Sequence, residues 1–102
     1  MRQFDAFLNP SERRRDVAPY FVVLSSHHLQ SLDEAVVAPL IRDWSKTLNE
    51  VDVVLDWRGE TLLLAMTELF SMPSAQLRSR AGDLLDEEDV IRRALERLFS
   101  GF

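Results

Sequence analysis

The chain has 102 residues and a formal net charge of −5 at pH 7, with 46% hydrophobic residues and no cysteine. This length and apolar content fit one domain over residues 1–102 with its own hydrophobic core. The lack of cysteine excludes disulfides and thiolate metal sites and favours a reducing compartment, so we expect a cytoplasmic protein. The acidic balance argues against direct nucleic-acid binding, and no apolar stretch approaches the length of a membrane span.

The N-terminal segment predicts two strands joined by a charged loop. Gln3–Leu8 alternates apolar and polar side chains and ends in a turn signal at residues 9–11. Arg13–Arg15, the basic run of the sequence, follows this turn and reads as a solvated loop. Tyr20–Leu24 is a β-branched and aromatic run. It predicts a second strand, able to pair with the first.

The next segment predicts a third strand and a short helical turn. Val36–Ile41 has the apolar character of a strand. Pro39 restricts that strand to an edge or a bulge, because proline has no N–H to donate to a ladder. The spacing of apolar residues in Arg42–Glu50 suits a short helix or a helical turn, and the pattern does not decide between them.

The clearest alternation of the sequence predicts a hairpin. Val51–Trp57 places its odd-numbered side chains on one face and Asp52, Val54 and Asp56 on the other. Arg58 and Gly59 form a tight turn signal before the apolar run Thr61–Thr67. We expect this hairpin at the centre of the sheet, and a last short strand at Ala75–Leu77.

The C-terminal segment predicts an amphipathic helix. Asp86 is placed to cap it, with Asp89 reaching back in a capping box, and Gly101 is placed to end it. Glu88 with Arg92, and Asp89 with Arg93, have the spacing of ion pairs. An apolar stripe recurs at helical intervals and needs a cover: Ile91, Ala94, Leu95, Leu98 and Phe102. Short strands followed by one terminal helix predict a small, partly closed antiparallel barrel with a helix on it.

Catalytic and metal sites are disfavoured by the residues present. His27 and His28 follow two serines, but adjacent side chains on a strand point to opposite faces and cannot share one metal. A serine beside a histidine also lacks the third group that orients a catalytic base. Asp52 and Asp56 are expected in solvent, without the pocket that general acid catalysis needs. We therefore expect no metal, no cofactor and no enzymatic activity.

Several segments, in order and spacing, resemble the CcdB family of toxins over nearly the whole chain. They are Tyr20–Leu29 (YFVVLSSHHL), Val36–Leu40 (VVAPL), Phe70–Pro73 (FSMP), Asp83-Leu84 and the ending from Ile91 through Ala94 to Leu98–Phe102. The resemblance implies a mainly β fold with a C-terminal α-helix: an SH3-like five-stranded antiparallel barrel with a small accessory sheet. It also implies assembly as a two-fold homodimer.

The resemblance implies inhibitory binding as the function. Members of this family bind the A subunit of DNA gyrase and trap the cleaved DNA complex, and a cognate antitoxin neutralises them through a disordered C-terminal segment. The gyrase-binding positions correspond here to Phe99, Ser100, Gly101, Phe102, Glu96, Arg93, His28 and Leu29, with Gln30 beside them.

The chain departs from the best-known family ending, Phe-Trp-Gly-Ile, at two of its four positions. Ser100 stands where that pattern has tryptophan, a side chain that can stack on an arginine, and Phe102 stands where it has isoleucine. Two alternatives therefore stay open. One is a ribonuclease of the kind found among toxins that share the barrel, and the other is a non-toxic homologue retained as an antitoxin-binding dimer.

Overall fold

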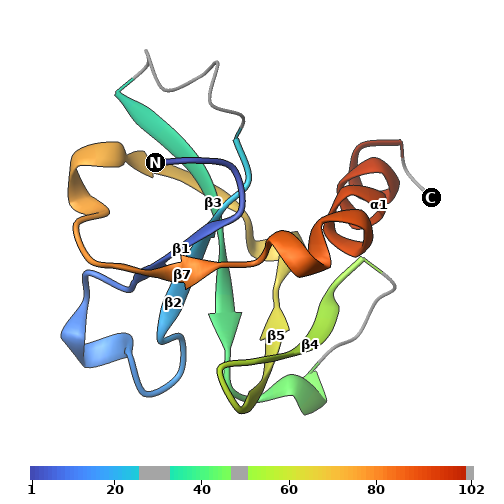
Figure 1. Cartoon of the computed structure of the whole chain (residues 1–102), viewed down its shortest axis with the longest axis horizontal. Helices are drawn as coiled ribbons and strands as arrows, with labels where there is room; N and C mark the ends of the chain where they lie inside the picture. Colours follow the sequence, from blue (N-terminus) through green and yellow to red (C-terminus); the bar gives the residue numbers. More distant parts are fainter. Residues whose placement is uncertain (26–32, 47–50, 101–102) are drawn as a thin grey trace.

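A single antiparallel sheet and a C-terminal helix make up the computed structural model, which describes residues 1–25, 33–46 and 51–100 (Figure 1). Seven strands join in the order β4-β5-β3-β2-β1-β7, and β6 pairs with β3 off this path. The strands are β1 Asp5–Leu8, β2 Tyr20–Val23, β3 Glu34–Ile41, β4 Val53–Trp57, β5 Glu60–Leu64, β6 Phe70–Pro73 and β7 Arg80–Asp83. The helix α1 spans Glu88–Ser100.

The predicted mainly β fold with a C-terminal helix is confirmed, and the strands curl into a half-barrel (Figure 1). Short 3₁₀ turns connect several elements: η1 Glu12–Arg14, η3 Trp44–Lys46, η4 Met66–Glu68, η5 Ser74–Gln76 and η6 Leu85–Glu87. The turn η3 agrees with the helical turn predicted within Arg42–Glu50, whose residues 47–50 lie outside the described residues.

The strand β3 is the centre of the sheet, although Pro39 predicts an edge or a bulge. It pairs with β2 along one side and with both β6 and β5 along the other. Pro39 lies where β6 has ended, at Val37, and before the pairing with β5 begins, at Leu40. Its carbonyl oxygen accepts the N–H of Ala65 at 3.0 Å on that side. The backbone groups of Pro39 face this side, away from its β2 partner Phe21, and neither β5 nor β6 pairs with Pro39 here. The missing N–H therefore breaks no ladder bond.

The predicted hairpin is confirmed as β4 and β5, but it lies at the edge of the sheet. Its turn residues have positive φ, 55° at Arg58 and 80° at Gly59, which suits a two-residue turn between twisted strands. Val53 and Leu55 are buried while Val54 is exposed, as the alternation predicts. The expectation that this hairpin forms the centre is wrong, because β4 pairs with β5 alone.

Two strands follow that the sequence pattern does not reveal. Phe70–Pro73 forms β6 against the first half of β3, and Arg80–Asp83 forms β7 against β1. The expected strand at Ala75–Leu77 is wrong, since η5 occupies most of that segment. Each new strand has four residues and contains proline or glycine, so its conformation depends on its partner strand more than on local propensity.

The two ends of the sheet approach each other through the side chain of Trp57. Its Nε1 donates to the carbonyl oxygen of Asp83 at 2.9 Å, and its ring packs edge-on against Tyr20 at 4.9 Å. A Cβ added at Gly82 would lie 3.0 Å from Cζ2 of Trp57, so the backbone of β7 passes close to the ring. Arg58 also donates to the carbonyl oxygen of Ala81 at 2.6 Å. These contacts join β4 to β7 at one end of the half-barrel.

The helix α1 lies beside β4 and packs against η4 and η6 (Figure 1). Ile91 and Ala94, from the predicted apolar stripe, are buried in the main core. The predicted pair of Glu88 and Arg92 forms at 3.2 Å. The predicted cap at Asp86 is wrong, because this residue lies inside η6 and it is Asp83 that accepts a backbone N–H there, from Leu85 at 3.1 Å. The predicted helix stop, Gly101, lies outside the described residues.

Candidate binding surface on the C-terminal helix

The last turn of α1 presents polar and aromatic side chains to solvent. Phe99 is 75% exposed, a high value for an aromatic side chain. Glu96 and Ser100 are also exposed, and so is Arg93 one turn earlier. The helical period explains this arrangement, since these positions lie away from the buried stripe of Ile91 and Ala94. Four predicted site residues are thus brought together on one element: Arg93, Glu96, Phe99 and Ser100.

The remaining predicted positions cannot be placed. His28, Leu29, Gln30, Gly101 and Phe102 lie outside the described residues, as does the serine and histidine cluster after Ser25. Within residues 1–25, 33–46 and 51–100, no group of three acidic or histidine side chains could hold a metal ion. None of the helices in these ranges is long and apolar enough to cross a membrane.

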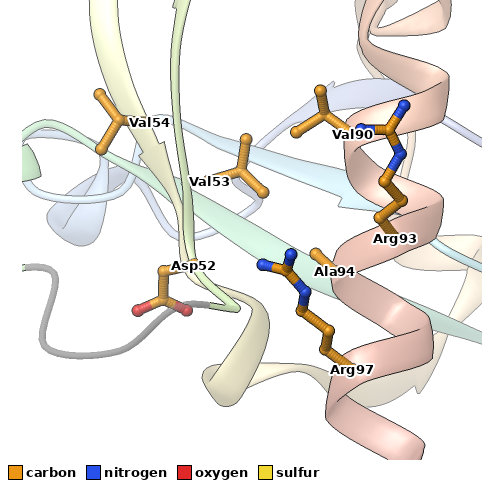
Figure 2. A pocket seen from close by; sticks show the side chains of 7 residues that line it. All are labelled: Asp52, Val53, Val54, Val90, Arg93, Ala94 and Arg97. Carbon is orange, nitrogen blue, oxygen red and sulfur yellow. The ribbon is translucent and has the colours of Figure 1, made fainter. Parts of the chain in front are cut away.

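A groove of about 300 Å³ runs between β4 and α1 (Figure 2). One wall is Asp52 and the first residues of β4, Val53 and Val54. The other wall is one side of α1, formed by residues at helical spacing: Val90, Arg93, Ala94 and Arg97. Val54 and Val90 are 46% and 42% exposed, so the groove joins exposed apolar surface on both elements.

The electrostatics of this groove are dominated by two guanidinium groups. Figure 2 shows Arg97 extending from α1 toward the strand, with Arg93 one turn earlier. Neither of them forms an ion pair with an acidic group in the described part of the chain. Asp52, on the opposite wall, accepts the backbone N–H of Thr67 at 3.3 Å and its hydroxyl at 3.4 Å. With two guanidinium groups against the single carboxylate of Asp52, the lining of the groove is basic by one charge in a chain of net charge −5.

Sequence reasoning singled out Arg93 but missed the groove as a feature. Arg97 follows Arg93 at the i,i+4 spacing, which was the available signal that both share one helix face. The other wall could not be inferred, because it requires β4 to be the edge strand beside α1.

A second groove, of about 510 Å³, lies over β2 and β3 and the loop after β1. Phe21 and Phe70 pack edge-on there, with ring centroids 5.3 Å apart. Val17 is 62% exposed beside them, and Arg13 and Arg14 contribute to the lining. The arginine run predicted as a solvated loop thus borders an apolar surface.

The sequence of the chain matches the family model described as CcdB protein over residues 3–101. The chain belongs to the CcdB family. CcdB proteins are toxins of toxin–antitoxin systems, so the resemblance inferred from the sequence is confirmed and an antitoxin is implied as a partner.

Among solved structures, this CcdB family member is similar to the Mycobacterium tuberculosis toxin MazF-mt6. The TM-score is 0.62 at 19% sequence identity, and the match covers 83% of this chain and 94% of the MazF-mt6 chain. At this identity the likeness concerns the fold. A search of curated proteins found no significant match.

Proposed function

We propose that this CcdB family toxin binds the A subunit of DNA gyrase through the end of α1 and traps the cleaved DNA complex. The observation that carries the proposal is the exposure of Phe99, at 75%, on the last turn of a helix whose opposite face is buried in the core. An exposed aromatic side chain on a rigid helix is a suitable anchor for a protein partner.

The chemistry of this helix end favours a basic, apolar-lined target surface. The last turn of a helix carries a partial negative charge from its unpaired carbonyl groups, and Glu96 adds a carboxylate to it. Phe99 adds a ring that can pack on an aliphatic stem or a guanidinium plane. Together they suit an arginine-bearing site on the partner protein, with Arg93 available for an acidic neighbour.

We further propose a cytoplasmic homodimer that an antitoxin neutralises through a disordered C-terminal segment. Gyrase is two-fold symmetric, so a symmetric toxin can place two helix ends against equivalent surfaces at once. Two linked contacts also strengthen binding without any new type of interaction. Inhibition is by binding, with no chemical step performed by the toxin.

The direct test is incubation of the protein with gyrase, ATP and supercoiled plasmid. The proposal predicts accumulation of linear DNA when the gyrase is denatured, together with growth arrest when the protein is expressed. If neither linear DNA nor growth arrest is observed, gyrase poisoning is excluded for this chain.

The same samples address the alternative functions. Sequence-specific cuts in an RNA cleavage assay would indicate a ribonuclease. If the native chain is inactive and Ser100→Trp gains gyrase poisoning, the protein is a non-toxic homologue, because the variant restores the stacking side chain that the best-known family ending has at this position.

A further inference from the structure

The strand β4 offers an open edge for pairing with another chain. It is the terminal strand of the sheet and pairs with β5 alone among the described strands. Val54 and Asp56 are exposed along it, while the intervening Leu55 is buried. Edge strands carry backbone groups that can pair with an added strand, and natural proteins often protect them.

The register of the hairpin shows which backbone groups face outward. In a hairpin with a two-residue turn, the residues that flank the turn, Trp57 and Glu60, form a hydrogen-bonded pair. Hydrogen-bonded and non-bonded pairs then alternate along the ladder, so the pair of Val54 and Leu63 is non-bonded. The N–H and C=O of Val54 therefore point away from β5. Val54 also lines the groove between β4 and α1.

The groove adds side-chain chemistry to this open edge. A strand added to β4 would lie about 4.8 Å from it, on the side where the groove opens toward α1. Arg93 and Arg97 border this space from α1, and the exposed surface of Val90 continues its apolar wall. Two guanidinium groups favour carboxylates on the incoming segment. The apolar wall favours small aliphatic side chains between those carboxylates.

We propose that the edge of β4 and the facing side of α1 bind an extended acidic segment of the antitoxin by strand addition. The proposal assigns a binding site to the partner that the family membership implies. Main-chain pairing at Val54 supplies affinity, while Arg93 and Arg97 select acidic residues. Arg93 is also one of the positions proposed to meet gyrase, so a segment bound in this groove would cover part of that surface. One helix would then connect neutralisation with poisoning.

A synthetic peptide of alternating valine and glutamate tests the proposal without knowledge of the antitoxin. Titrated into the isotopically labelled protein, it should shift the amide signals of Val54, Asp56 and residues 90–97 and slow hydrogen exchange at the amide of Val54. The matched control is a peptide of alternating valine and lysine. The proposal is wrong if both peptides bind equally, or if the shifts cluster in the groove around Phe21 and Phe70.

Val54→Pro isolates the main-chain contribution. Proline removes the outward N–H and breaks no bond of the β4–β5 ladder, so we expect a loss of peptide affinity of about tenfold. The matched control Val54→Thr keeps the N–H and should bind like the parent. Equal affinity of the two variants would contradict strand addition.

A charge reversal tests the same site if Val54→Pro does not fold. Arg97→Glu should weaken binding of the valine–glutamate peptide about tenfold. Arg13→Glu makes the same charge change in the distant second groove and should leave the affinity unchanged. Equal losses in both variants would indicate general charge attraction and overturn the assigned site.

The peptide-binding experiments do not depend on whether the protein binds gyrase. Failure of the proposed function appears as absence of linear DNA with every variant, whereas failure of this inference appears as unchanged peptide affinity in Val54→Pro and Arg97→Glu.

Discussion

Phe99 places an aromatic ring in solvent where the helix ends, although burying such a ring is ordinarily favourable. Truncation to alanine should change the free energy of unfolding by less than about 0.5 kcal/mol, because an exposed side chain contributes little to the core. We expect the same change to reduce plasmid linearisation by gyrase at least about tenfold, as for a central interface anchor. Urea unfolding and the linearisation assay measure the two effects separately.

The control for this prediction is Val17→Ala, which removes a similarly exposed apolar side chain, 62% exposed, from the loop before β2. It should leave both stability and linearisation unchanged. If Phe99→Ala and Val17→Ala linearise plasmid equally well, the exposed ring has no part in gyrase binding.

At Gly82 the ring of Trp57 leaves little room for a side chain. The Cα of Gly82 lies against this ring, and an added Cβ would meet Cζ2 at 3.0 Å. Gly82→Ala must move the ring and strain the hydrogen bond from Trp57 to Asp83, so we expect a loss of about 1 to 3 kcal/mol in the free energy of unfolding. Urea unfolding followed by tryptophan fluorescence reports this loss. An unchanged midpoint of urea unfolding would show that the ring of Trp57 can move aside without a loss of stability.

The elements differ in how far the sequence determines them. β1, β2, β4 and β5 follow from alternation or β-branched runs, and α1 follows from its apolar stripe. β6 and β7 are too short for a pattern, and their conformation depends on pairing with β3 and β1.

The sequence predicts the wrong strand at the centre of the sheet for a physical reason. The local rule for Pro39 assumes a continuous partner strand on each side, and it does not foresee that β3 changes partner from β6 to β5 at this residue. The candidate site also has a part that the sequence predicts and a part that it does not. Arg93, Glu96 and Phe99 follow from position on one helix, whereas the groove with Val54 requires the tertiary placement of β4.

The helix α1 owes its position to a few core contacts, and this gives a prediction at the scale of the element. Ile91 is fully buried, so Ile91→Ala should reduce the free energy of unfolding by about 2 to 5 kcal/mol. The adjacent Val90 is 42% exposed, and Val90→Ala should cost much less. Denaturant unfolding of the two variants provides the comparison. Similar losses of unfolding free energy in the two variants would mean that the exposed face of α1 contributes as much to stability as the buried face.

At the scale of the whole molecule, one helix serves the fold and the proposed contacts together. Ile91 and Ala94 hold it on the half-barrel, Arg93 and Arg97 face the groove beside β4, and Phe99 extends into solvent. The half-barrel itself acts as a rigid support, joined between β4 and β7 by Trp57. On this helix, the positions that affect stability are therefore different from the positions that affect binding.

The most direct test of this account compares the full chain with a chain lacking residues Ser100–Phe102, in the plasmid linearisation assay with gyrase and ATP. The account predicts linear DNA with the full chain and none with the shortened chain, while circular dichroism and thermal unfolding of the two remain alike because the terminal residues contribute little to the core. Equal amounts of linear DNA from both chains would contradict the claim that the C-terminal end of α1 binds gyrase.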